Sequence, residues 1–406
     1  MKKKFAKIWG VGLTFVLLAS LMVFALPAPV LAAEPVINEW DEFDYPDTGE
    51  DGDWFWDAHI DAVGHDGTLY AYAWVNANDN RSHNPGEDVL FKSDDGGRTW
   101  EETDYADDLT GEGAIVDIAC SSLEDLADTL YVTDGNYVYK TDDAGDTWDY
   151  VAQASLETVL EGDITSIDVG YDDDDDPYVF MGSSDGAYGG SVYFVAESGH
   201  EVMWKDLEIW QVAGYDVYAV AASPKFADSG EVFAVVTNDA PYTAVLSNEK
   251  GTTGDWDEFA ELLYDCVTPF GISAASRIGF PDDWDDTETL FVGVVSPGDG
   301  GDVYAVSEDE SIDRNVRPGT GGCVGDATNI ISLDVCGNTD DGSQIAGAND
   351  DTTVYYSTDG GWEWDPSEKN PTGEDTTYVL WVGDCGESAV AATAGCECAF
   401  SLPCIS

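Results

Sequence analysis

Short apolar runs rich in β-branched and aromatic residues recur along the chain, separated by segments of Gly, Asp and Asn. They come in groups of three, and each group is followed by a polar box and one more extended segment. The first run of a group lies, for example, at 114–120, 164–170, 216–223 and 329–335. This chemistry predicts strands and tight turns, and no helical periodicity of useful length is present. Four short strands in each unit of about 50–55 residues predict a β-propeller blade.

The polar box fixes the length of the repeat. It reads SDDGGRTW at 93–100, TDDAGDTW at 141–148 and STDGGWEW at 357–364, and a degraded copy, SNEKGTTGDW, occupies 247–256. The distances between successive boxes correspond to one or two repeat units. Where a distance corresponds to two units, an eroded copy of the box lies near the middle, at 196–204 and at 306–313. Six units follow, and a seventh begins at 376.

The seventh unit ends where its box should begin. Residues 37–47, INEWDEFDYPD, resemble the segment that follows the degraded box at 254–265. We therefore predict an all-β, seven-bladed β-propeller of four-stranded antiparallel blades. In this prediction an N-terminal strand at 36–45 closes the last blade. The alternative is a chain truncated at Ser406 that has lost the remaining strands of that blade.

Residues 1–33 have the pattern of a signal peptide. A lysine-rich start precedes a long apolar run from Ile8 to Leu26, and small residues follow at Ala32 and Ala33. This pattern predicts export with cleavage near Ala33, leaving a single propeller domain at 34–406 and a secreted or cell-surface protein. The run is long enough to span a membrane, so membrane contact is expected only if the segment stays uncleaved.

The charge is strongly acidic. The chain carries 82 acidic and 15 basic residues, a formal net charge of −67, and removal of the four leader lysines makes it −71. Phosphate backbones would be repelled, which excludes nucleic acid as a partner. Such a charge suits solubility in salty surroundings or cation binding.

All eight cysteines lie in the exported part. Outside the cytoplasm this even number favours disulfides, although the sequence does not give their pairing. Cys396, Cys398 and Cys404 lack a nearby histidine that would complete a zinc site.

The box resembles the Asp-box, or BNR repeat, of sialidases, xyloglucanases, sortilin-type receptors and photosystem assembly factors. Two copies match it fully, and the third has Glu363 in place of the Thr. The matching residues are Ser93, Asp95, Gly97, Thr99, Trp100, Thr141, Asp143, Gly145, Thr147, Trp148, Ser357, Asp359, Gly361 and Trp364. The resemblance implies a secreted bacterial type of propeller whose boxes sit on hairpins away from the functional face. Hydroxyl, carboxylate, glycine and tryptophan in this order suit a stapled turn, so we expect a structural role and no catalytic one.

Sialidase activity is not expected. Holding a sialic acid carboxylate needs an arginine cluster, and the chain has five arginines, one of them inside a box. A hydrolase acting on a neutral glycan needs two carboxylates flanking a cleft. The chain has 82 acidic residues, so finding a candidate pair in the sequence carries almost no information. Tryptophans outside the boxes are expected either to stack on sugars or to pack between blades. These tryptophans are Trp54, Trp56, Trp74, Trp210, Trp284 and Trp381.

An aspartate flanked by apolar residues recurs in the first run of four units. These are Asp61, Asp117, Asp168 and Asp334. One hypothesis is a partial carboxylate ring that binds Ca²⁺ in the central channel. The other is that each aspartate accepts backbone hydrogen bonds from a neighbouring blade, and we favour it.

A second candidate calcium site is the acidic run at 172–176, with Asp172, Asp174 and Asp176 as ligands and the loop at 76–88 as a further oxygen source. Its alternative is a solvated loop. No cofactor is required by the sequence, and the four histidines are too scattered to predict a zinc site.

Two functions remain open. The first is a non-catalytic extracellular protein that binds a protein or glycan partner, or that assembles with itself in a surface layer. The second is a glycoside hydrolase acting on a neutral polysaccharide. Fold resemblance does not choose between them, because propellers support both.

Overall fold

A computed structural model describes residues 55–393 with internal gaps. The gaps are 65–66, 76–87, 106–113, 136, 152–161, 198–202, 210–213, 250, 265–266, 275, 299, 315, 317–327, 350–351, 368–369, 372–375, 383–384 and 387–388. The chain divides into two units, 1–36 and 37–406, and the first lies wholly outside the described residues. The account below concerns the second. Within the described part, no helix has the length and apolar character needed to cross a membrane.

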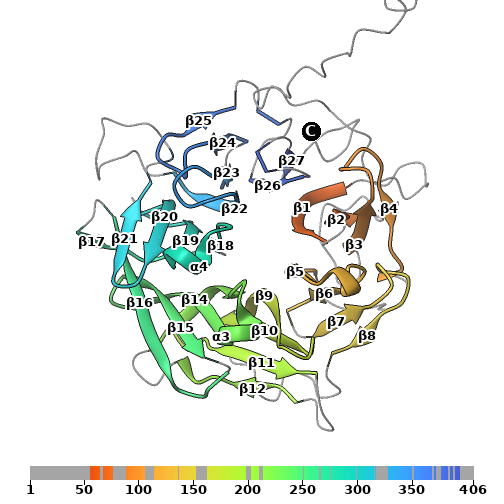
Figure 1. Ribbon diagram of the computed structural model, residues 1–406, viewed down its shortest axis with the longest axis horizontal. Helices are drawn as coiled ribbons and strands as arrows, with labels where there is room; N and C mark the ends of the chain where they lie inside the picture. Colours follow the sequence, from red (N-terminus) through yellow and green to blue (C-terminus); the bar gives the residue numbers. More distant parts are fainter. Residues whose placement is uncertain are drawn as a thin grey trace, which may run out of the picture. The chain divides into compact units, whose positions relative to one another are not determined.

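The unit is built from antiparallel sheets arranged as blades around a centre (Figure 1). Blade 1 contains β1 (Phe55–Val63), β2 (Leu69–Val75), β3 (Asp88–Ser93) and β4 (Glu101–Glu102). Blade 2 contains β5 (Asp117–Cys120), β6 (Leu130–Thr133), β7 (Val138–Thr141) and β8 (Asp149–Tyr150). Blade 3 contains β9 (Asp163–Tyr171), β10 (Pro177–Ser184), β11 (Val192–Ala196) and β12 (Lys205–Asp206).

The next three blades repeat this order. Blade 4 contains β13 (Asp216–Ala222), β14 (Glu231–Asn238), β15 (Tyr242–Glu249), β16 (Trp256–Tyr264) and a fifth short strand, β17 (Thr268–Pro269). Blade 5 contains β18 (Arg277–Gly279), β19 (Leu290–Val294), β20 (Asp302–Ser307) and β21 (Glu310–Asp313). Blade 6 contains β22 (Ile330–Cys336), β23 (Ser343–Ala348), β24 (Val354–Ser357) and β25 (Asp365–Pro366).

The seventh sheet has two described strands, β26 (Thr377–Trp381) and β27 (Ala389–Thr393). The prediction of four-stranded antiparallel blades is therefore confirmed for six blades and not for a seventh. The strand expected at 36–45 and the residues after 393 lie outside the described part of the chain.

One apolar cluster fills each interface between neighbouring blades. Alternating side chains of a strand point to opposite faces of its sheet, so each blade contributes one face to the cluster before it and one to the cluster after it. Between blades 1 and 2, for example, Leu90 packs with Ile118 and Leu130. The two-stranded sheet packs in the same way against blade 1, where Val390 joins the cluster of Ile60 and Phe91. The sheets thus form a closed ring of interfaces.

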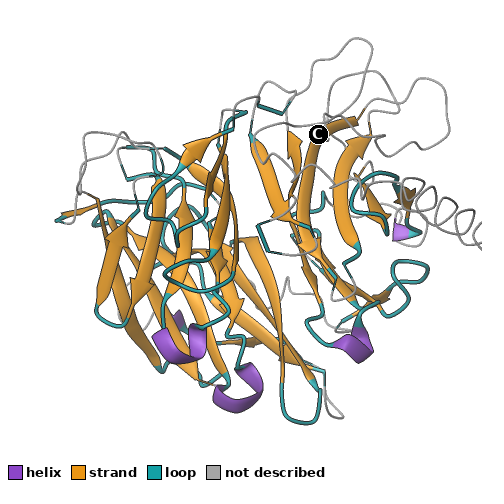
Figure 2. Cartoon of the chain, turned by 45° about the horizontal axis from the view of Figure 1, so that its top comes forward, coloured by secondary structure: helices purple, strands orange, loops and turns teal. Residues whose placement is uncertain are grey.

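Among the helical elements of the described part of the chain, three short ones lie between the first two strands of a blade, and Figure 2 draws helices in purple. They are η1 (Glu124–Leu126), α3 (Phe226–Ser229) and α4 (Trp284–Thr287). The side chains of Phe226 and Trp284 anchor the two α-turns in the interblade clusters.

A disulfide joins Cys336 at the end of β22 to Cys385 in the turn between β26 and β27. The Cα atoms are 5.5 Å apart, and 49 residues separate the two cysteines in the sequence. It confirms the expectation of a disulfide in this chain, and it fits folding in an oxidising compartment. Cys266, Cys323, Cys396, Cys398 and Cys404 lie outside the described residues.

Candidate binding site at the channel mouth

The innermost strands of the seven sheets surround a channel with two cavities. The cavity at one mouth has a volume of about 540 Å³ and is lined where these strands begin and where the second strand of a blade ends. The cavity inside the channel has a volume of about 300 Å³. Arg277 lines both cavities and so marks the boundary between them.

Three aromatic rings are stacked at the mouth. His59 on β1 lies between Tyr72 on β2 and Tyr378 on β26, with ring centroids 4.6 Å and 4.0 Å apart and interplanar angles of 22° and 29°. The Tyr72 hydroxyl donates to the Val116 carbonyl at 3.1 Å and lies 3.0 Å from His59 Nδ1. Because its proton is committed to Val116, Nδ1–H of His59 is the donor to this hydroxyl. Tyr72 is 4% exposed and His59 is stacked against both tyrosines, so Tyr378 is the ring of the stack that can offer a flat face to a sugar.

An ion pair crosses the channel beneath the stack. The Arg277 guanidinium on β18 donates to Asp117 Oδ1 on β5 at 2.9 Å, and the side chains are 25% and 2% exposed. The other carboxylate oxygen of Asp117 accepts from the Ile167 backbone N–H at 2.9 Å. Blades 2, 3 and 5 thus meet at one carboxylate, whose two oxygens both have donors.

Two exposed carboxylates lie on one side of the mouth. Asp163 begins β9 and Asp185 follows β10, and both line the cavity. Asp163 pairs with Ser184, so the two side chains belong to adjacent strand ends of blade 3. Hydrogen bonds from the backbone N–H groups of Gly189 and Ala187 lower the pKa of Asp185. This carboxylate is held in its charged form, which does not suit a general acid.

The inner-strand aspartates link consecutive blades. Asp117 accepts from Ile167 in blade 3, and Asp168 accepts from the Ala222 N–H in blade 4 at 2.7 Å. Asp334 accepts from the Trp381 N–H of the seventh sheet at 2.8 Å. These are the backbone contacts that the favoured hypothesis expects, although the side chain of Asp61 on β1 lies outside the described part.

The surroundings of the inner-strand aspartates differ along the channel. Asp117 lines the mouth, whereas Asp168 and Asp334 line the interior cavity. Burial raises the pKa of Asp168 to about 7 and that of Asp334 to about 6. The described residues include no cluster of three His, Cys, Asp or Glu side chains that could hold a metal ion. Calcium binding by these aspartates stays a prediction.

The acidic run at 172–176 forms the β9–β10 turn on the opposite face from the mouth. Asp172 Oδ1 accepts from the backbone N–H groups of Asp174 and Asp176 at 3.0 and 3.1 Å. One carboxylate therefore organises the turn locally, as in an Asx turn. Most of the loop at 76–88 lies outside the described residues, so its expected contribution of oxygen ligands stays a prediction.

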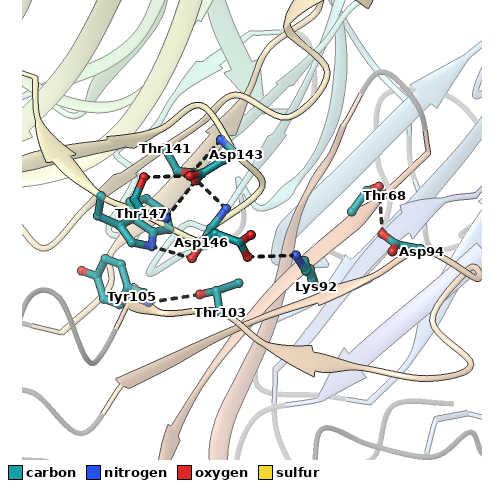
Figure 3. Close-up of polar contacts among 11 residues, drawn as sticks. Thr68, Lys92, Asp94, Thr103, Tyr105, Thr141, Asp143, Asp146 and Thr147 are labelled. Carbon is teal, nitrogen blue, oxygen red and sulfur yellow. Dashed lines mark hydrogen bonds and ion pairs between the residues drawn. The ribbon is translucent and has the colours of Figure 1, made fainter.

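The two boxes that match the motif fully share one hydrogen-bond pattern. In the second box the Thr141 hydroxyl accepts from the Gly145 N–H at 2.9 Å and donates to Asp143, which also accepts from the N–H and hydroxyl of Thr147 (Figure 3). The Trp148 indole N–H donates to the Gly145 carbonyl at 3.1 Å. The first box repeats every one of these contacts with Ser93, Asp95, Gly97, Thr99 and Trp100.

The third box keeps the backbone part of the pattern. Gly361 N–H donates to the Ser357 hydroxyl at 2.9 Å, and Trp364 Nε1–H donates to the Gly361 carbonyl at 2.9 Å. The backbone N–H of Glu363 donates to Asp359 at 2.9 Å. A hydroxyl at this position is therefore dispensable, whereas the backbone donor is kept.

Each box hairpin also contacts the blade before it. In the second box, the Gly145 carbonyl accepts from the Asp104 N–H of blade 1 at 2.9 Å, and Asp146 lies 3.7 Å from Lys92 (Figure 3). A Cβ on Gly145, whose φ is 96°, would lie 2.7 Å from Thr103, which explains the glycine. The degraded box of blade 4 keeps the contact in reverse, with the Gly254 N–H donating to Leu207 of blade 3 at 2.9 Å.

The residues of the channel mouth were not singled out by the sequence, apart from Asp117. His59, Tyr72, Tyr378 and Asp163 come from segments far apart in the chain and share no motif. The one local signal was the position of Asp163 at the start of the inner strand β9. The tryptophans considered as sugar platforms and described here, Trp284 and Trp381, are buried among blades. Trp54 and Trp210 lie outside the described residues, as do the side chains of Trp56 and Trp74.

Comparison with known proteins finds distant similarity to solved structures. No family model matches the chain, and no curated protein matches it. Among solved structures, YCF48 from Cyanidioschyzon merolae is 16% identical over 87% of this chain and 94% of its own, with a TM-score of 0.49. The arabinanase of Penicillium chrysogenum, solved with arabinobiose, is 13% identical over 84% and 89%, with a TM-score of 0.42. An ancestral GH74 enzyme is 14% identical over 82% of this chain and 46% of its own, with a TM-score of 0.44.

Proposed function

We propose that this chain is an exported Asp-box propeller of seven blades that binds a neutral glycan at the channel mouth without cleaving it. The observation that carries the proposal is the stack of His59, Tyr72 and Tyr378 on the wall of a cavity of about 540 Å³. Flat rings and a few placed polar groups are how proteins bind sugars of no net charge. Secretion and the remaining strands of the seventh blade are parts of this proposal.

The charges at the mouth support a neutral ligand. Among the described residues that line it, Arg277 is the one arginine, and it donates to Asp117. An acidic sugar would need a guanidinium that is not already paired, and it would also meet the field of a strongly negative protein.

The mouth carboxylates support binding rather than hydrolysis. A glycosidase places two carboxyl groups on opposite sides of the scissile bond, and its acid has a raised pKa. Asp163 and Asp185 lie on one blade, the pKa of Asp185 is lowered, and both oxygens of Asp117 accept hydrogen bonds. Asp168 and Asp334, whose pKa values are raised, line the channel interior and accept from backbone N–H groups.

Hydrolysis of a neutral polysaccharide is the second candidate. It is favoured by the presence of two exposed carboxylates, Asp163 and Asp185, on the wall of the mouth cavity. In that case Asp163 and Asp185 would be the residues to test first.

The test is a panel of neutral polysaccharides incubated with the purified protein, scored for co-sedimentation and for new reducing ends. We expect retention without reducing ends, and about tenfold weaker retention for Tyr378→Ala, the loss that 1.4 kcal/mol of binding energy corresponds to. The control is Tyr150→Ala, because Tyr150 is an exposed tyrosine on β8, outside the mouth cavity. Reducing ends that disappear in Asp185→Asn or Asp163→Asn would establish the hydrolase instead. Equal retention of both tyrosine variants would refute binding at the mouth.

A further inference from the structure

A third cavity lies between blades 2 and 3 on the face that carries the boxes. Its volume is about 370 Å³, and its walls come from η1, β6, β7 and the β9–β10 turn. This cavity is separate from the channel mouth, because the β9–β10 turn and the start of β9 are at opposite ends of one strand. None of the contacts described for glycan binding involves it.

The walls carry far more negative than positive charge. Six carboxylates face one ammonium group, that of Lys140; they are Asp125, Asp128, Asp142, Asp175, Asp176 and Glu197. Lys140 Nζ lies 3.1 Å from Asp142 Oδ1 and 3.1 Å from Glu197 Oε2, so its charge is shared by two of them. A further cation would therefore enter a favourable potential.

Two buried polar atoms on the walls make no hydrogen bond of normal geometry with any described residue, although their side chains are close enough to interact with each other. One is the hydroxyl of Tyr131, a side chain with 0% exposure, and the other is Oε1 of Glu197. A buried polar atom without a partner costs about 1–3 kcal/mol, so such atoms are rare and call for an explanation. Both atoms can accept from an N–H donor, and Glu197 can do nothing else when ionised.

The ionisation of Glu197 depends on its surroundings. Burial raises the pKa of this carboxyl, and Lys140 and the Tyr131 hydroxyl offset the shift only in part. A second cation beside Oε1 would stabilise the carboxylate that burial disfavours.

We propose that this interblade cavity binds a guanidinium group. A guanidinium has five N–H donors in one plane and is more weakly hydrated than an ammonium group, so it can satisfy Glu197 Oε1 and the Tyr131 hydroxyl together. Ca²⁺ fits less well, because the described residues offer no cluster of three ligands with the geometry to hold a metal. The guanidinium belongs either to a small molecule or to an arginine of a partner protein.

Calorimetry with agmatine tests the proposal. The titration uses the purified protein in about 0.3 M NaCl, a concentration that screens non-specific attraction of cations to an acidic surface. Putrescine serves as the ammonium counterpart, and the tripeptide Gly-Arg-Gly tests the polypeptide source. We expect one saturable site for agmatine and weaker binding of putrescine. Tighter binding of the tripeptide than of agmatine would assign the site to a partner protein.

Three variants make the result specific. Glu197→Gln should weaken agmatine binding at least tenfold, and the nearly isosteric Tyr131→Phe should weaken it several-fold. Asp149→Asn removes the same charge from exposed β8 and should leave it unchanged. The thermal unfolding midpoint of each variant shows that it is folded.

Heats that do not saturate, or that are the same in Glu197→Gln, Tyr131→Phe and Asp149→Asn, would overturn the proposal. So would equal affinities for agmatine and putrescine. Glycan binding is measured by co-sedimentation and concerns the channel mouth, on the opposite face. Failure of this proposal and failure of glycan binding are therefore distinguishable.

Discussion

Asp117, Asp168 and Asp334 on the innermost strands each connect one blade to the next, and burial raises the pKa of the last two. Asp168 accepts from the Ala222 N–H, and burial raises its pKa to about 7. Its pKa in the unfolded chain is close to the ordinary 3.8. Between these values the folded protein holds a proton that the unfolded chain has lost. The stabilisation is complete below pH 3.8 and is lost as the pH rises through 7.

We therefore predict that Asp168→Asn is more stable than the parent above pH 7. The amide oxygen can still accept from Ala222, and the charge that burial disfavours is gone. Each pKa unit is worth about 1.4 kcal/mol, and contact with the channel cavity reduces the effect, so we expect a gain of about 1–2 kcal/mol at pH 8. Urea unfolding at pH 5 and pH 8 measures it.

The control for this prediction is Asp163→Asn, a change at the exposed start of the same strand. It should alter the difference in stability between pH 5 and pH 8 by less than about 0.5 kcal/mol. An Asp168→Asn protein whose unfolding free energy falls between the two pH values as steeply as the parent's would contradict the assignment.

At the scale of the element, the box hairpin combines a local turn with a contact to the preceding blade. Thr141 is 1% exposed, and its hydroxyl is the acceptor for the Gly145 N–H. Gly145 in turn accepts from Asp104 of blade 1 through its carbonyl. Loss of the hydroxyl would leave a buried N–H without its acceptor in the residue that links the two blades.

We predict that Thr141→Val lowers the free energy of unfolding by about 1–3 kcal/mol, the cost of a buried donor left unpaired. Thr147→Val in the same box is the matched control, because that hydroxyl is exposed and donates to a carboxylate that keeps its other donors. It should cost less than about 1 kcal/mol. Equal losses in chemical unfolding would show that the buried acceptor has no special role.

The box hairpins could be predicted from sequence because every residue of the staple lies within eight positions. Ser93, Asp95 and Gly97 specify their turn without help from distant parts of the chain. The same is true of the alternating runs that became strands. The count of blades was harder, because the seventh sheet has two described strands and the strand expected at 36–45 lies outside the described residues.

The channel mouth could not be predicted for the same physical reason. His59 and Tyr378 are stacked, yet more than 300 residues separate them in the chain. Arg277 of blade 5 and Asp117 of blade 2 form an ion pair across the channel. Asp117 was identified because its flanking pattern repeats, but nothing local indicated that it pairs with an arginine.

At the scale of the whole molecule, the ring depends on its last interfaces. The seventh sheet packs on blade 1 through Val390 and is joined to blade 6 by the Cys336–Cys385 disulfide. A cross-link between residues 49 apart lowers the entropy of the unfolded chain.

We predict that Cys336→Ser with Cys385→Ser lowers the free energy of unfolding by about 2–4 kcal/mol, the usual range for a native disulfide. Chemical unfolding of the double variant beside the parent measures the loss, and the parent in reducing agent should show the same loss. An unchanged midpoint in both would mean that the disulfide does not limit opening of the ring.

The contact between each box hairpin and the blade before it has a further consequence for how such a protein can change over generations. Each repeat unit carries a hairpin that contacts the preceding blade and an edge that the hairpin of the following blade contacts. The hydrogen bonds of Gly145 with Asp104 and of Gly254 with Leu207 are two such contacts. A gene segment that encodes one unit, duplicated in frame, would therefore supply a new blade together with its contacts to both neighbouring blades. The ring is a structure that can grow or shrink by whole blades, while the mouth acquires or loses one wall at a time.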